Sequence, residues 1–142
     1  MKRVFLIITL LIAVAVLITG CSSEAVSIED HVWKLRTVIV NNSDASVPAV
    51  GEPDEVYPEA KVVDVTLTAN DGMITIADAT NGQTYAGTYE AVNKTPDGTD
   101  YNVTIDGIAG FAAAAMTTYA DGEKQPTLPI NLGDYSVYFI AQ

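Results

Sequence analysis

The sequence has almost no histidine or cysteine, two residue types on which catalysis and metal binding often depend. Its 142 residues include one cysteine, one histidine and one tryptophan. One cysteine excludes a disulfide within the chain, and zinc would need several histidine or cysteine ligands. A catalytic triad would have to use His31, and Asp30 does not become its orienting partner merely by being adjacent. No phosphate-binding loop or nucleophile elbow is present. We therefore expect a non-catalytic protein, with no metal and no cofactor.

Basic residues are also scarce. Lysine and arginine number seven against eighteen aspartates and glutamates. Lys2 and Arg3 lie in a segment that we expect to be removed, which leaves five basic residues and a net charge of −13. This charge argues against a nucleic-acid partner and against a domain lying flat on anionic lipid. It favours solubility, with a cationic partner or loosely held divalent cations as the alternative.

The N-terminus has the three parts of an export signal. Two basic residues precede an apolar run of fifteen residues, Val4 to Ile18, which is shorter than the roughly 20 residues of a membrane span. The sequence Leu17-Ile18-Thr19-Gly20-Cys21 follows. It resembles the lipobox of bacterial prolipoproteins, with Ile18 where leucine is commoner. This resemblance implies that residues 1–20 are removed and that Cys21 is joined to a diacylglycerol. Two acyl chains would hold the protein stably on the extracytoplasmic face of a bacterial membrane.

The remaining 122 residues are enough for one domain with a single core. We expect residues 21–30 to be the lipidated cysteine and a short tether, and residues 31–142 to be the folded domain. Within it, residues 42–60 are acidic and carry prolines at positions 48, 53 and 58. Prolines at this spacing exclude a helix and a central strand, so we expect a long loop there.

Alternating apolar and polar residues, separated by Asn-Gly and Asp-Gly turn signals, predict strands over most of the domain. The predicted strands are 32–41, 62–69, 73–78, 83–92, 100–106, 109–119, 126–132 and 134–141. The segment 109–119 is ambiguous, because Ala112–Ala115 favour a helix while Thr117, Thr118 and Tyr119 suit a strand. A strand is the preferred interpretation, and a short helix is the alternative.

Short links between consecutive strands favour antiparallel neighbours. A meander of eight strands leaves two exposed edges unless it closes. We therefore predict an all-β fold, a small antiparallel eight-stranded meander barrel, with a two-sheet sandwich as the alternative. The chain resembles the lipocalin-like domains of bacterial lipoproteins in its strand count, in Trp33 near the start of the first strand, and in Thr117-Thr118-Tyr119 and Asp134-Tyr135. His31 stands where the lipocalin pattern has glycine, and no binding residue can be carried over.

Two kinds of binding function follow from this fold. Small residues at positions 87, 110, 112 and 114 would leave room inside the barrel for a small apolar or cationic ligand. Trp33, Tyr85, Tyr89 and Tyr101 are the candidate lining residues, and the loop 42–60 is a candidate lid. In the other interpretation the small residues mark a bent strand, and the tyrosines fill the core. The outer surface would then engage a protein partner at the cell envelope, or a hydrolase that it inhibits.

Overall fold

The computed structural model describes residues 25–41, 48–50 and 61–142, and this part of the chain contains strands, turns and loops but no helix. Its strands are β1 (Trp33–Val40), β2 (Pro48–Val50), β3 (Val65–Asn70), β4 (Met73–Asp78), β5 (Gln83–Thr95), β6 (Gly98–Ile105), β7 (Ile108–Thr118), β8 (Lys124–Leu132) and β9 (Tyr135–Ala141). The strand predicted for 109–119 is therefore confirmed over Ile108–Thr118. Cys21 and most of the loop 42–60 lie outside the described residues.

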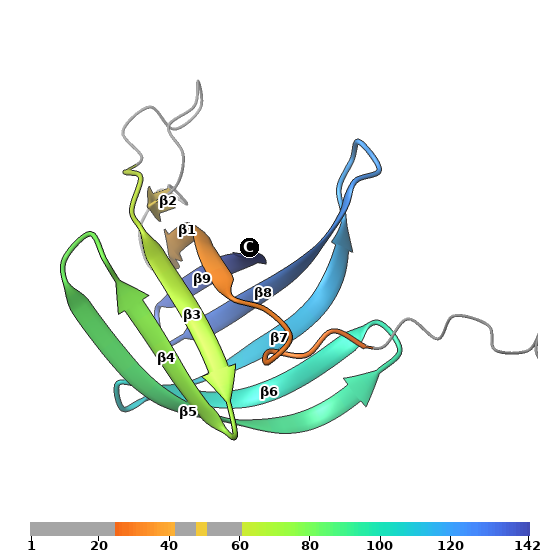
Figure 1. The fold of residues 1–142 in the computed structure, drawn as a ribbon, viewed down its shortest axis with the longest axis horizontal. Coiled ribbons are helices and arrows are strands. Elements are labelled where there is room, and N and C mark those ends of the chain that lie inside the picture. The colour runs from red at the N-terminus through yellow and green to blue at the C-terminus, as the bar shows by residue number, and fades with distance from the viewer. Residues whose placement is uncertain (1–24, 42–47, 51–60) are drawn as a thin grey trace, which may run out of the picture.

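The strands form one antiparallel sheet that curls into a closed barrel (Figure 1). From β3 to β9 each strand pairs with the next, and β1 pairs along its length with β9. Two residues of β1 also pair with β3, Trp33 with Leu67 and Lys34 with Thr66. Strands β1 and β3–β9 thus make the predicted eight-stranded barrel, and the single continuous sheet replaces the two-sheet alternative.

Strand β2 was not predicted, because its first residue is a proline. It pairs with the later half of β1, at Val38 with Val50 and Ile39 with Pro48. Proline lacks a backbone N–H and is tolerated on an edge strand. The three-residue β2 is such an edge, beside Val38 and Ile39, which lie further along β1 than the two residues that pair with β3.

Short turns join the strands of the hairpins. Asp71 and Gly72 have φ angles of 50° and 79°, as a type I′ hairpin turn requires of both its central residues. The turn between β4 and β5 depends on Asn81, whose side-chain and backbone N–H groups both donate to the Asp78 carboxylate, at 2.7 and 3.0 Å. These hydrogen bonds hold the pKa of Asp78 below its ordinary value of 3.8.

The alanine-rich strand β7 is explained by its neighbours. Ala112 pairs with Tyr101 on one side and Ile130 on the other, and all three side chains are buried. A larger residue at position 112 would compete with the tyrosine ring for the same space. Packing inside the barrel therefore overrides the helical preference of the alanines.

The barrel has two different ends. The β3–β4, β5–β6 and β7–β8 turns, the C-terminus and the segment before β1 lie at one end. The β4–β5, β6–β7 and β8–β9 turns and the end of β1 lie at the other. Residues 25–32, here called the plug, pass across the interior at the first end, which we call the plugged end (Figure 1).

The plug is part of the core. Ile28 is fully buried and Val26 is 8% exposed. The Trp33 indole Nε1 donates to the Ile28 carbonyl at 2.7 Å, and the Ile28 N–H donates to the Tyr101 hydroxyl at 3.1 Å. This corrects the expected tether 21–30: the folded domain begins by Val26, because two apolar side chains in a polar stretch complete the core.

Candidate functional site

Two of the four predicted ligand-binding residues are sealed inside the plugged end. Trp33 is fully buried and Tyr101 is 2% exposed. Both make hydrogen bonds to the plug, and the Tyr101 hydroxyl also lies 3.1 Å from Ser27 Oγ. The Trp33 and Tyr101 side chains thus form hydrogen bonds with the backbone N–H and carbonyl of Ile28. They hold part of the chain itself at the place where we expected a ligand.

A third candidate, Tyr89, belongs to the same cluster. Its hydroxyl donates to the Glu29 carboxylate in the plug. Its ring meets the Tyr101 ring edge to face, with centroids 5.6 Å apart and an interplanar angle of 81°. His31 packs in the same manner on Trp33, at 5.2 Å and 86°. The single histidine, which is part of the plug, is thus half-buried.

The fourth candidate, Tyr85, lies apart from the others. It precedes Tyr89 by four residues on β5, which places it roughly 13 Å nearer the opposite end. Its hydroxyl donates to Gln83. The structure therefore brings Trp33, Tyr89 and Tyr101 together around the plug and leaves Tyr85 separate.

The small residues bring strands together. A Cβ atom on Gly110 would lie 2.2 Å from the Asn131 carbonyl oxygen, and one on Gly87 would lie 2.4 Å from the Thr104 carbonyl oxygen. Contacts this short leave no room for a side chain. Both glycines permit close backbone approach, which favours the bent-strand interpretation of these positions.

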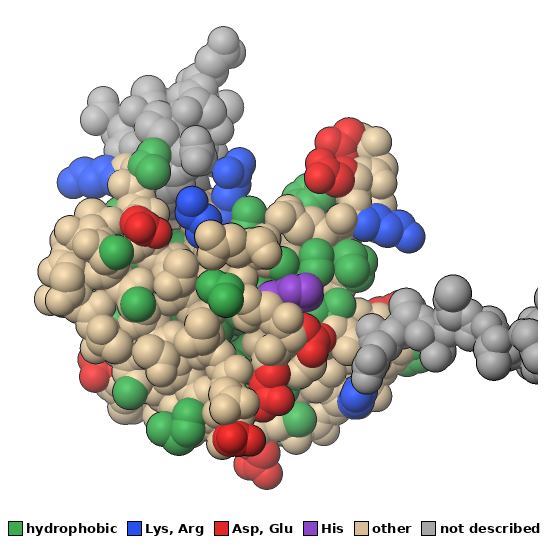
Figure 2. Space-filling model, in the orientation of Figure 1, with side chains coloured by type: hydrophobic (Ala, Val, Ile, Leu, Met, Phe, Trp, Pro, Cys, Tyr) green, Lys and Arg blue, Asp and Glu red, His purple; other side chains and the backbone are tan. Residues whose placement is uncertain are grey.

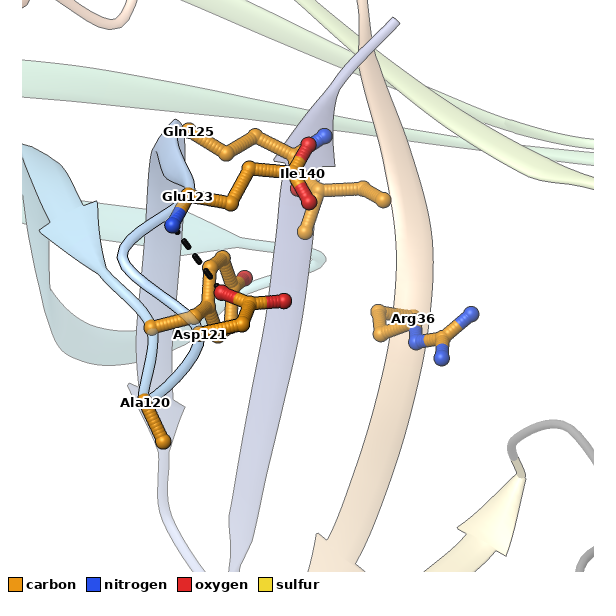
Figure 3. A pocket seen from close by; sticks show the side chains of 7 residues that line it. Arg36, Ala120, Asp121, Glu123, Gln125 and Ile140 are labelled. Carbon is orange, nitrogen blue, oxygen red and sulfur yellow. Dashed lines mark hydrogen bonds between the residues drawn. The ribbon is translucent and has the colours of Figure 1, made fainter.

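A groove lies on the outside of the barrel, over β1, β9, β8 and the β7–β8 hairpin (Figure 3). Its first part has a volume of about 480 Å³ and is lined by Arg36, Tyr119, Ala120, Asp121, Glu123, Gln125 and Ile140. A second part of about 380 Å³ is lined by Arg36, Thr37, Thr117, Tyr119, Thr127, Pro129, Tyr138 and Phe139. Because Arg36 and Tyr119 line both parts, we treat them as one surface and call it the outer groove.

Strand register explains why these side chains, apart from Phe139, point outward. Leu128 and Phe139 pair with each other and are buried, so their neighbours on the same strands alternate to the outer face. Thr127 and Ile140, which also pair, are two of those neighbours. Arg36 lies at a β-bulge, where the β1–β9 register shifts between Leu35 and Thr37. Bulges re-aim side chains, and this one places an exposed arginine beside the groove.

The β7–β8 hairpin forms one wall because it extends beyond its neighbours. The last β6–β7 pair is Gly98 with Ala115, and the β8–β9 pairing begins only at Thr127. Residues 116–118 of β7 and 124–126 of β8 pair with each other past these points. In Figure 1 the hairpin rises clear of the barrel. The projecting arm makes a concave surface on a barrel wall that would otherwise be convex.

The charges in the outer groove are separated by sign. Asp121 and Glu123 are exposed at the hairpin tip, where the Glu123 N–H donates to Asp121 Oδ1 at 2.9 Å. Arg36 is on β1. Because β9 lies between β1 and β8, the axes of β1 and β8 are roughly 10 Å apart. In Figure 3 the Arg36 guanidinium lies across the Ile140 strand from the Asp121 carboxylate. Within the part of the chain that the structure describes, Arg36 forms no ion pair with Asp121 or Glu123.

Sequence reasoning missed the outer groove. Its only local signals were Asp121 and Glu123 flanking Gly122 at a hairpin tip, and an arginine within the first strand. No set of three or more histidine, cysteine, aspartate or glutamate side chains within the described ranges is arranged to hold a metal ion. Nor does any helix there have the length and hydropathy to cross a membrane.

No protein-family model matches the chain, and neither does any curated protein or solved structure.

Proposed function

We propose that this chain is a non-catalytic binding protein, anchored through Cys21 to the extracytoplasmic face of a bacterial membrane, and that the outer groove is where it binds a protein partner at the cell envelope. One observation carries the choice of site. At the plugged end the chain fills its own interior, whereas the outer groove offers separated charges and two exposed tyrosines, Tyr119 at 40% and Tyr138 at 41%.

The plug determines how the molecule would be oriented if it is anchored as proposed. Only five peptide steps separate Cys21 from Val26, the first core residue. Fully extended, that stretch spans at most about 18 Å. A lipidated Cys21 would therefore hold the plugged end next to the membrane, with the end that carries the loop 42–60 facing away from it.

Replacing Cys21 by serine tests the anchor. We expect Cys21→Ser to move the protein from the membrane fraction to the soluble fraction, or to leave an unprocessed precursor, because serine cannot form the thioether to diacylglycerol. Membrane fractionation and the mass of the mature N-terminus measure this. Ser22→Ala is the matched control and should behave as the unchanged protein. Acylated, membrane-bound Cys21→Ser protein would refute the proposal.

A small apolar or cationic ligand inside the barrel is the second candidate function. It is favoured by inward apolar side chains that are only partly buried, among them Ile76, Tyr85, Leu132 and Val137, which lie toward the end opposite the plug. Native mass spectrometry of residues 22–142, purified without detergent, tests it. A reproducible added mass that is lost on denaturation would favour the interior. A mass without any addition, together with no thermal shift from apolar and cationic compounds, would leave the outer groove as the candidate binding site.

A further inference from the structure

We propose that the outer groove binds an extended, basic segment of a partner polypeptide, with a lysine or arginine placed against Asp121 and Glu123 and an acidic group placed against Arg36. This inference rests on the proposed function, since it names the chemistry of the partner bound at the same site.

The shape of the groove favours an extended chain. Its two parts meet at Arg36 and Tyr119 and run from the hairpin tip to Thr37 and Tyr138 across strands β8, β9 and β1. Small molecules bind preferentially in enclosed concave pockets, whereas this surface is long and lies on the outside of the barrel. The half-exposed rings of Tyr119, where the two parts meet, and of Tyr138, in the second part, would give large contact areas for apolar side chains of a bound segment.

Charge complementarity favours a basic segment. Two carboxylates at the hairpin tip face the groove from one side, and the single guanidinium of Arg36 lies on the other. In Figure 2 acidic side chains lie at the tip of the hairpin, as they also do elsewhere on this face. A basic side chain lies lower on the hairpin, and further basic side chains lie across a hollow from the tip, near β1. The net charge of −13 after removal of residues 1–20 attracts cations over a longer range. A segment with basic residues and one acidic group matches both the local pattern and the overall charge.

The same charges argue against other extended ligands. A nucleic acid or an anionic lipid surface would bring phosphates toward Asp121 and Glu123, and like charges brought this close repel. The polar side chains along the groove suit a peptide backbone. Gln125 Nε2 donates to the Ala141 carbonyl at 3.4 Å, which leaves the Gln125 amide oxygen to accept from a bound N–H group. Thr37 adds a hydroxyl on the opposite strand.

Selection of peptides on the protein tests the proposal. The full mature chain, purified with its anchor in neutral detergent, is used to select from a phage-displayed library of random eight-residue peptides. We expect the enriched peptides to be rich in lysine and arginine, with an aromatic residue and one acidic residue. Their affinities are then measured by fluorescence anisotropy on the full mature chain and on three variants.

The variant Asp121→Asn/Glu123→Gln removes the tip charges without changing side-chain size, and should weaken the selected peptides about tenfold or more. Asp71→Asn/Asp97→Asn is the matched control, with the same loss of charge in turns at the same end but outside the groove, and should change affinity less than twofold. Equal weakening by both variants would overturn the inference, because it would show general attraction to an acidic protein.

Tyr138→Arg separates failure of this inference from failure of the proposed site. Peptides without basic enrichment that still lose binding to Tyr138→Arg would overturn the basic-segment inference while keeping the groove as the binding surface. No enrichment at all, or peptides that bind every variant equally, would overturn both. Matched thermal unfolding midpoints for all the variants would show that the barrel is intact.

Discussion

Thr99, at the plugged end, has a buried hydroxyl group without a hydrogen-bond partner among the described residues. It is 5% exposed and faces the interior beside Tyr101 and Ala114. A buried polar group left unsatisfied costs about 1–3 kcal/mol. By contrast, the hydroxyls of Thr117 and Thr127 lie 2.7 Å apart across β7 and β8 and satisfy each other.

We expect Thr99→Val to stabilise the protein by about 1 kcal/mol, because valine has nearly the same shape and removes the unpaired hydroxyl. Urea unfolding followed by circular dichroism measures this, with an unchanged m-value as a check. Thr127→Val, the matched control, removes a paired hydroxyl and should destabilise. A loss of stability in Thr99→Val would show that its hydroxyl has a partner, such as an ordered water.

Among the elements, β7 shows how a strand can depend on residues with small side chains or none. Gly110 allows the carbonyl of Asn131 on β8 to approach so closely that a methyl group would lie 2.2 Å from its oxygen and 2.7 Å from Leu132 Cδ2. Two residues further on, Ala112 takes its place between Tyr101 and Ile130. Small residues on this strand set how tightly it packs against β6 and β8.

We expect Gly110→Ala to destabilise the barrel by about 1–3 kcal/mol, since the backbone of β8 must move to admit the methyl group. Thermal unfolding measures the effect. Ala109→Ser is the control, because it adds one atom at the neighbouring exposed position and should change stability by less than about 0.5 kcal/mol. A stable Gly110→Ala variant would mean that the strands have room to separate, as an interior cavity would require.

At the scale of the whole molecule, much of the fold follows from sequence. Period-two alternation and the Asp71-Gly72 and Asn81-Gly82 turns predict the hairpins, and the short links predict the barrel. The plug could not be predicted in this way. Val26 and Ile28 are only two apolar residues in a mostly polar stretch, which is too short an alternation to indicate a strand. Trp33 and Tyr101 were recognised as interior residues, but their hydrogen bonds to the plug depend on tertiary contacts.

The outer groove was unpredictable for a different reason. It exists because β7 and β8 continue past the last pairs that they make with β6 and β9, and because β1 has a bulge at Arg36. Both features belong to the register between strands, which residue spacing within one strand does not specify. Sequence patterns thus locate the strands, while the candidate site arises from how far each strand overlaps its neighbours.

The pairing of β1 with β9 also has a consequence for the order of events in biogenesis. These first and last barrel strands are separated by roughly a hundred residues of chain, and contacts between such distant segments form late. Until β9 has been synthesised, β1 lacks the neighbour along which it makes most of its pairs, and the barrel stays open. A nascent chain that cannot complete its fold before its last strand emerges stays unfolded for longer, and this delay would suit the export that the proposed anchor requires if the chain crosses the membrane unfolded.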